Sequence, residues 1–292
     1  MRIGRPRRGP VYPPIPHGAL PPARTLVVPG RGEMFLRDTG GDGRPVLLLH
    51  GWLVTADLNW CGAYDALTAA GYRVLAPDHR GHGRGIRSLH PFRLSDCAAD
   101  AAALLAALGT GPAIVVGYSM GGAIAQLLAR DHPESVGGLV LSATCQHFQD
   151  AETRGAWKWM WLLRLALGVA PRISYATGFA RLGLPSDERG AWWLSEMLRL
   201  DSVVGAEAGR ELGRFDSRPW LAPLAIPAAV VVTSADRSVS PTKQRELAAA
   251  LNATVHEAAI DHLDLTERAD LYNPALLDAI AAVSRPAGAS VE

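Results

Sequence analysis

A strand-like run that ends in a serine between two glycines constrains the fold of this chain more than any other feature. Residues 113–124 read AIVVGYSMGGAI, and a helix-like sequence, AIAQLLARDHP, overlaps their end. Gly117 and Gly121 lack the Cβ atoms that would block a tight strand-to-helix turn. The pattern predicts a strand–turn–helix unit with the Ser119 hydroxyl exposed at its corner, so Ser119 is a candidate nucleophile. The alternative is an ordinary serine in a glycine-rich loop.

Further apolar runs have the character of strands buried on both faces of a parallel sheet. They are residues 46–50, 73–76, 138–142 and 228–233, in addition to 113–117. Helical patterns lie around residues 59–70, 94–108, 122–132, 243–251 and 274–283. This alternation predicts an α/β fold in which helices connect the strands of a sheet.

The interval 146–223 breaks this alternation, because it contains no convincing buried strand and holds six of the eight tryptophans. Ligands bind at the carboxyl ends of the strands in α/β proteins, and we expect this interval to form a helical lid there. The core would then comprise residues 25–145 and 224–292.

The first 24 residues form a basic arm rich in proline and arginine, which we expect to be extended or disordered. Residues 1–31 hold six arginines and no acidic residue, whereas the whole chain has a net charge of +1. We interpret the arm as a solvated leader, and a tether to a partner or an anionic surface is the alternative.

Charge and cysteine usage exclude several classes of protein. The net charge of +1 disfavours a nucleic-acid binder. The three cysteines form no CxxC pair, which is typical of a reducing compartment and predicts neither a disulfide framework nor a zinc site. Asp78, His79 and His82 lack a second ligand cluster, so we expect no metal. No apolar run reaches the roughly 18 residues that span a bilayer, and no secretory signal is present, which predicts a soluble cytoplasmic protein.

An acid and then a base, both later in the chain than Ser119, would complete a catalytic triad with this nucleophile. Asp236 directly follows the strand 228–233, and His262 follows the strand-like segment ATVHEAAI. A serine hydroxyl needs a base to take its proton, and a carboxylate fixes the tautomer of that base. Asp201 and Asp216 are weaker candidates for the acid because they lie in the expected lid. His256 is the weaker candidate for the base because it lies within the strand-like segment.

Backbone N–H groups at the mouth of the sheet would stabilise the oxyanion of a tetrahedral intermediate. Met120 follows the nucleophile at the start of a helix and supplies one such donor. The loop His50-Gly51-Trp52-Leu53 follows a buried strand, and we assign the amide of Trp52 as the second donor. We expect His50 to brace this loop through hydrogen bonds.

Together these motifs resemble the α/β-hydrolase fold superfamily over about residues 25–283. They are His50-Gly51, Asp78-x-Arg80-Gly81-His82-Gly83, Gly117-x-Ser119-x-Gly121, Asp236 and His262. The resemblance implies a mostly parallel eight-stranded sheet flanked by helices, with a helical cap inserted after the sixth strand. It implies that Ser119, Asp236 and His262 form the catalytic triad and that the amides of Trp52 and Met120 form the oxyanion hole.

Three departures from the family pattern limit the expected reaction. The serine nucleophile differs from the aspartate of epoxide hydrolases and haloalkane dehalogenases. The sequence HGWLVT replaces the HGGG-type loop of one large lipase and esterase group. Asp261 stands where the family commonly has glycine in the histidine loop, and Asp264 lies on the other side of His262.

We therefore predict a serine hydrolase that cleaves small-molecule carboxylic esters or thioesters through an acyl-enzyme, without a cofactor. Tyr118, Trp157, Trp161 and Trp192 are candidate pocket residues that favour an apolar acyl group, although lid tryptophans can equally pack helices on the sheet. Residues 157–170 are a candidate for peripheral membrane contact or for the core of the cap. The alternative reactions of this triad are lactone hydrolysis, C–C bond hydrolysis, acyl transfer and perhydrolysis. A non-catalytic ligand-binding homologue is the alternative from another class.

Overall fold

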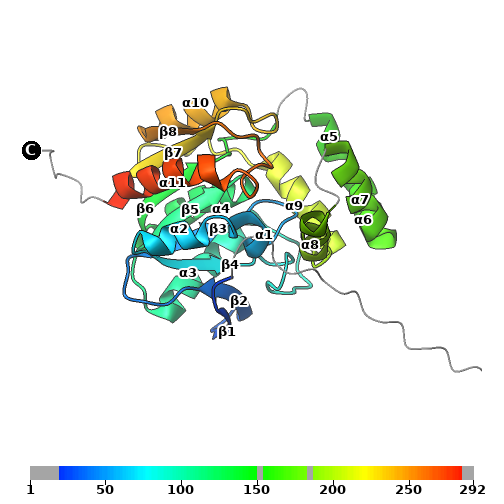
Figure 1. The fold of residues 1–292 in the computed structure, drawn as a ribbon, viewed down its shortest axis with the longest axis horizontal. Coiled ribbons are helices and arrows are strands. Elements are labelled where there is room, and N and C mark those ends of the chain that lie inside the picture. The colour runs from blue at the N-terminus through cyan, green and yellow to red at the C-terminus, as the bar shows by residue number, and fades with distance from the viewer. Residues whose placement is uncertain (1–19, 150–153, 183–186, 285–292) are drawn as a thin grey trace, which may run out of the picture.

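The computed structural model describes residues 20–149, 154–182 and 187–284, and an eight-stranded sheet forms its centre (Figure 1). The strand order across the sheet is β1-β2-β4-β3-β5-β6-β7-β8. β1 pairs with β2, and β2 with β4, in antiparallel fashion, and every later neighbour is parallel. The strands are β1 (Ala23–Val28), β2 (Gly32–Asp38), β3 (Pro45–Leu49), β4 (Arg73–Pro77), β5 (Ala113–Tyr118), β6 (Val136–Ser142), β7 (Ala228–Thr233) and β8 (Thr254–Ala258).

Helices cover both faces of the sheet, because alternate residues of each central strand point to opposite sides. Leu47 and Leu49 face α3 (Leu94–Leu108), α4 (Met120–Asp131) and α10 (Pro241–Leu251). Val46 and Leu48 face α1 (Ala56–Trp60), α2 (Tyr64–Ala69) and α11 (Ala269–Ser284). The predicted α/β fold with a mostly parallel eight-stranded sheet is therefore confirmed.

Two local features differ from the sequence-based expectation. The helix expected over residues 59–70 is two short helices, α1 and α2, separated by a turn at Gly62. A Cβ on Gly62 would lie 2.8 Å from the Cβ of Ala269, so the start of α11 packs directly on this turn. The second feature is β1, whose first residues, Ala23 and Arg24, fall inside the expected arm and pair with Arg37 and Leu36. Residues 1–19 of that arm lie outside the described residues.

The interval between β6 and β7 contains helices, as its composition predicts. They are α5 (Arg154–Lys158), α6 (Met160–Val169), α7 (Pro171–Leu182), α8 (Glu188–Met197) and α9 (Ser202–Arg214). Figure 1 shows them together at one end of the sheet. A single bridge, His147 with Asp216, is the β-pairing found in the described part of this interval, and it joins its two ends. The exact boundaries of the cap, 146–223, stay a prediction.

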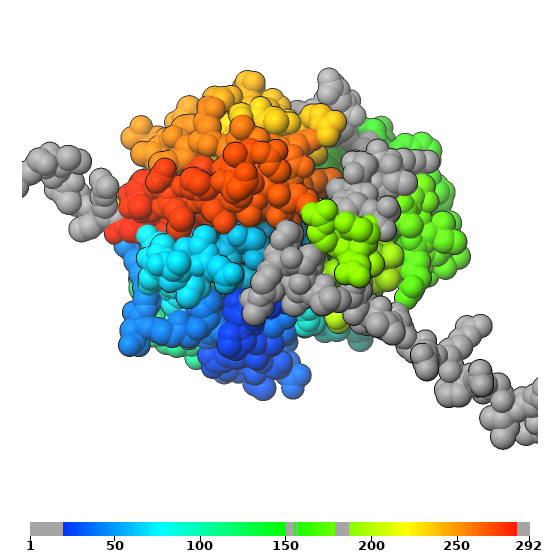
Figure 2. Space-filling view, viewed as in Figure 1, coloured from blue at the N-terminus to red at the C-terminus, as the bar shows by residue number. Residues whose placement is uncertain are grey.

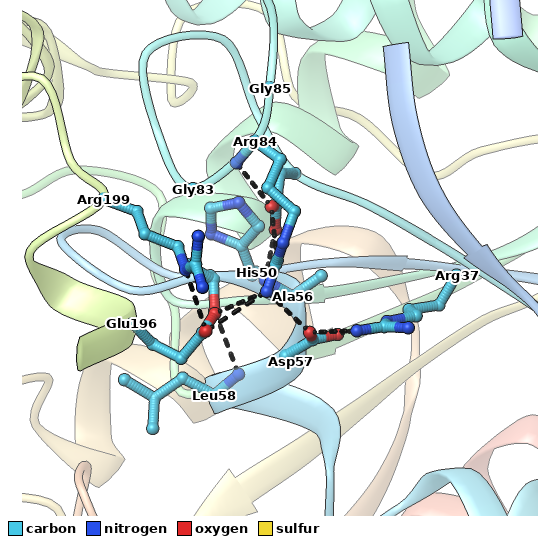
Figure 3. A network of polar contacts seen from close by, with 12 residues as sticks. Arg37, His50, Ala56, Asp57, Leu58, Gly83, Arg84, Gly85, Glu196 and Arg199 are labelled. Carbon is cyan, nitrogen blue, oxygen red and sulfur yellow. Dashed lines mark hydrogen bonds and ion pairs between the residues drawn. The ribbon is translucent and has the colours of Figure 1, made fainter. Parts of the chain in front are cut away.

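A buried ionic network fixes α8 to the core (Figure 3). Arg84, in the loop after β4, lies 3.0 Å from the carboxylates of both Asp57 and Glu196 and 3.1 Å from that of Asp78. Burial alone would lower the pKa of Arg84, but these carboxylates outweigh it and raise that pKa. Thr55 donates a further hydrogen bond of 2.9 Å to Glu196, so a cap helix shares its charged partners with the core.

None of the helices in the described ranges has the length and apolar character that crossing a membrane requires.

Candidate active site

Ser119 occupies a strained corner between β5 and α4. Its backbone has φ 55° and ψ −116°, a conformation that costs an L residue about 1–3 kcal/mol. A Cβ on Gly117 would lie 2.4 Å from the carbonyl oxygen of Gly121, and a Cβ on Gly121 would lie 2.1 Å from that of Leu49. Both positions therefore require glycine, which is the steric reason for the Gly-x-Ser-x-Gly pattern.

His262 joins Ser119 to Asp236 across the carboxyl ends of the parallel strands. Its Nε2 lies 3.0 Å from the Oγ of Ser119, and its Nδ1 lies 2.8 Å from Oδ2 of Asp236. A carboxylate only accepts hydrogen bonds, so Nδ1 carries the proton and Nε2 is left with a lone pair for the serine hydroxyl. The structure thus brings the three predicted residues together in the arrangement that activates a serine.

The carboxylate of Asp236 is held by both of its oxygens. Oδ1 accepts hydrogen bonds of 2.8 Å from the backbone N–H groups of Ser238 and Val239. Oδ2 accepts from the hydroxyl of Thr233 at 2.8 Å, and the amide of Gln244 lies 3.4 Å from it. Sequence reasoning missed Thr233 and Gln244. Thr233 ends β7 three residues before Asp236, but Gln244 lies in α10 with no local signal.

Asp261 and Arg237 connect the loop that carries the acid to the loop that carries the base. Oδ1 of Asp261 accepts from the backbone N–H of Arg237 at 3.0 Å and from that of His262 at 2.7 Å. Its Oδ2 accepts from Nε of Arg237 at 2.6 Å. Partial burial would raise the pKa of Asp261, but these donors outweigh it and lower that pKa.

The two predicted oxyanion donors come from segments on either side of Ser119. Met120 is the first residue of α4, where the N–H has no acceptor within the helix and the helix dipole is positive. A Cβ on Gly51 would lie 3.6 Å from the Cβ of Ser119, so the loop after β3 borders the nucleophile. The indole of Trp52 donates to the carbonyl of Gly205 in α9 at 2.8 Å.

His50 holds this loop in a fixed tautomer. The backbone N–H of His79 donates to Nε2 of His50 at 2.9 Å, so the proton is on Nδ1, which lies 2.8 Å from the carbonyl of Gly51. Complete burial lowers the pKa of His50 to about 4, so the imidazole is neutral. The ring acts as a brace for the loop, as the sequence suggests.

Comparison with known proteins decides the family. A family model described as alpha/beta hydrolase fold matches residues 44–183. A non-heme haloperoxidase of Rhodococcus erythropolis is 41% identical over 110 residues, 37% of this chain and 39% of that protein. A rhodomycin D methylesterase of Streptomyces peucetius is 43% identical over 94 residues, 31% of each chain. The chain therefore spans less than half the length of these curated relatives.

The similarity in fold extends over nearly the whole chain. The crystal structure of a hydrolase from Pseudomonas aeruginosa superposes with a TM-score of 0.77, covering 89% of this chain and 98% of that one at 23% identity. The chain is a member of the α/β-hydrolase fold superfamily. The helices α5–α9 follow the sixth strand, where the resemblance implies a helical cap.

The predicted pocket residues lie in different places around the α/β-hydrolase core. Tyr118 is buried beneath the site and donates a hydrogen bond of 2.7 Å to the carbonyl of His262. Trp157 has its ring centroid 5.9 Å from that of Trp52, beside the loop after β3. Trp192 is buried with residues of α1, and Trp161 is half exposed beside another tryptophan of the cap. Of the four, Tyr118 contacts His262, and Trp157 contacts the side chain of Trp52, whose amide is the second predicted oxyanion donor.

The weaker candidates for acid and base make other contacts. Asp201 caps α9 by accepting from the backbone at its start, and Asp216 pairs with Arg218. His256 lies in β8, with Nε2 3.3 Å from the hydroxyl of Thr254. Within the described ranges, no three His, Cys, Asp or Glu side chains are grouped so that they could hold a metal ion.

Proposed function

We propose that the protein is an enzyme that hydrolyses a small-molecule carboxylic ester or thioester through an acyl-enzyme on Ser119. The continuous contact from Asp236 through His262 to Ser119 carries this proposal, because it supplies nucleophile, base and orienting acid at hydrogen-bonding distance. The methylesterase relative and the family membership support it.

Each step uses atoms already in position. Oγ of Ser119 attacks the carbonyl carbon while its proton moves to Nε2 of His262, and the carboxylate of Asp236 stabilises the imidazolium. The N–H groups of Met120 and Trp52 are the proposed donors to the oxyanion. The imidazolium then gives its proton to the leaving alcohol or thiol. In the second half, His262 takes a proton from water, whose oxygen attacks the acyl carbon and releases the acid and the free serine.

Steady-state hydrolysis of p-nitrophenyl esters tests this mechanism. We expect Ser119→Ala and His262→Ala each to lower kcat by about 10⁴-fold or more, and the double variant to lose little further, because the residues act as a unit. Ser135→Ala, at the opposite end of the sheet, is the matched control and should keep the activity of the native chain. Full activity in Ser119→Ala would refute the mechanism.

We propose an apolar acyl group, because the ring of Trp157 packs on that of Trp52, in the loop that follows β3 and borders Ser119. The same p-nitrophenyl esters, taken as a series of increasing acyl length, should show kcat/KM rising with length. Trp157→Ala should flatten this rise, whereas Trp159→Ala, at an exposed position, should not. An equal loss for all chain lengths in Trp157→Ala would assign Trp157 to packing alone.

Perhydrolysis is the second candidate, and the name of the Rhodococcus relative favours it. Hydrogen peroxide in place of water would attack the same acyl-enzyme and release a peroxy acid and free Ser119. Peroxy acid formation from acetate and hydrogen peroxide, measured beside ester hydrolysis, separates the two activities. Both activities should disappear in Ser119→Ala.

The cytoplasmic location expected from cysteine usage stays a prediction.

A further inference from the structure

The cap carries an exposed apolar surface on α6 and the start of α7, which we call the α6–α7 surface. Its large side chains are between 41% and 77% exposed. They are Trp159, Trp161, Leu162, Leu165, Val169 and Ile173. In Figure 2 these green helices lie at the edge of the molecule, beyond the sheet and its covering helices. Surfaces of this kind mark interaction sites more often than chance exposure of single residues does.

Packing among the described residues does not account for these side chains. Met160 and Leu167 are buried, and they form the side of α6 that packs against the rest of the cap. Trp161, Leu165 and Val169 are spaced four residues apart, so they line one outer face of the same helix. A helix that is apolar on both sides needs a second apolar environment for its outer face.

The segment that carries this surface is basic. Residues 154–186 contain five basic residues and no acidic one. Of these, Lys158, Arg164 and Arg172 are exposed. Outside residues 1–31 and 154–186 the chain holds 18 basic and 28 acidic residues, so the rest of the molecule is acidic. The excess of basic over acidic residues therefore lies in the arm and in the part of the cap that carries the apolar surface.

We propose that the α6–α7 surface docks on a membrane that contains anionic lipid. Tryptophan and leucine side chains would enter the boundary between headgroups and acyl chains, and the lysine and arginines would pair with anionic headgroups. A second copy meeting the same surface would bring two basic segments together. The arginine-rich arm would likewise be repelled. Charge complementarity thus favours an anionic lipid surface over a second copy of the chain and over the arm.

Docking here would place the membrane against a part of the cap that connects to the candidate active site. α6 packs on α9, and α9 holds the indole of Trp52 through the carbonyl of Gly205. The binding itself is independent of the proposed hydrolysis, because no residue of the surface belongs to the triad. Either proposal can therefore fail while the other stands.

Vesicle flotation tests the docking directly. The full-length protein is mixed with phosphatidylcholine vesicles that either contain or lack phosphatidylglycerol, and activity on a soluble ester is measured in parallel. We expect the protein to float with the phosphatidylglycerol vesicles, and less of it to float as salt is raised. The variant Trp161→Ser/Leu165→Ser should lose at least about tenfold in vesicle affinity. Leu89→Ser, an exposed leucine elsewhere, is the matched control and should bind as the native chain does.

Further variants make the result decisive. Lys158→Gln/Arg164→Gln keeps the apolar side chains, and it should lose the preference for phosphatidylglycerol even if the serine variant fails to fold. A further variant replaces Arg2, Arg5, Arg7 and Arg8 with Gln. If binding survives both variants of the α6–α7 surface but is lost in this one, the membrane contact belongs to the arm and the proposal is overturned. No flotation, with a native dimer that Trp161→Ser/Leu165→Ser converts to a monomer, would assign the surface to a second copy and also overturn it.

Discussion

At the scale of single residues, the candidate site depends on two positions where an added Cβ atom would prevent the backbone turn at Ser119. Gly117 and Gly121 allow the backbone of Ser119 to turn, and both were evident from the sequence because a turn of this kind admits no Cβ at either position. Asp261 could be recognised from the sequence only as a departure from the family pattern. Its hydrogen bonds to Arg237 and His262 depend on two loops meeting, which the sequence alone does not reveal.

Asp261 is expected to position His262 rather than to take part in the chemistry. Asp261→Asn keeps the shape but loses the charge that pairs with Arg237, so we expect kcat on a p-nitrophenyl ester to fall about threefold to tenfold with KM nearly unchanged. The folded-state pKa of Asp261 is lowered, so its charge and this contribution persist from neutral pH down to that lowered pKa. Glu257→Gln, at an exposed ion pair, is the control. A change in KM alone would contradict a positioning role.

At the scale of elements, buried strands were easier to predict than exposed ones. β3 and β5 are almost wholly buried and read as apolar runs, whereas β1 is mostly exposed and its apolar run is only Leu26-Val27-Val28. The attachment of α8 had no sequence signal either, because Glu196 and Arg84 are 112 residues apart. Long-range charge pairs of this kind become visible only when the fold brings them together.

Loss of the charge on Glu196 should destabilise the attachment of the cap to the core. Glu196→Gln leaves Arg84 with two remaining carboxylates, so we expect the free energy of unfolding to fall by about 2 kcal/mol. Glu188→Gln, in the exposed first turn of the same helix, should change it by no more than about 0.5 kcal/mol. Urea denaturation of both variants measures the difference. Equal effects of the two substitutions would show that the network in Figure 3 adds nothing to stability.

At the scale of the whole molecule, three buried histidines couple stability to pH. Burial, and then the nearness of the other imidazoles, lowers the pKa of His79 well below 6.5 and that of His82 to about 3. The pKa of His50 is lowered to about 4 mainly by burial. The unfolded chain takes up protons below its ordinary histidine pKa of 6.5, whereas the folded chain does not. The stability that these neutral histidines contribute is therefore fully present above about pH 6.5, and it is lost as the pH falls towards 4.

This linkage predicts a steep acid dependence. Near pH 5 the three buried histidines should account for the uptake of about three protons on unfolding, each worth about 1.4 kcal/mol per pH unit. Urea denaturation at several pH values between 7 and 5 measures the slope, and His82→Gln should reduce it by about one proton. His90→Gln, at an exposed histidine, is the matched control. The same slope in His82→Gln would mean that His82 titrates normally.

The central claim, that His262 and Asp236 activate Ser119, is tested most directly by intact-protein mass spectrometry after exposure to a fluorophosphonate. An activated serine reacts with this reagent, whereas a serine hydroxyl without an adjacent base is a weak nucleophile. The account predicts one adduct on the native protein, none on Ser119→Ala, and strongly slowed labelling of His262→Ala. An unlabelled native protein that is folded, or an adduct that persists in Ser119→Ala, would contradict it.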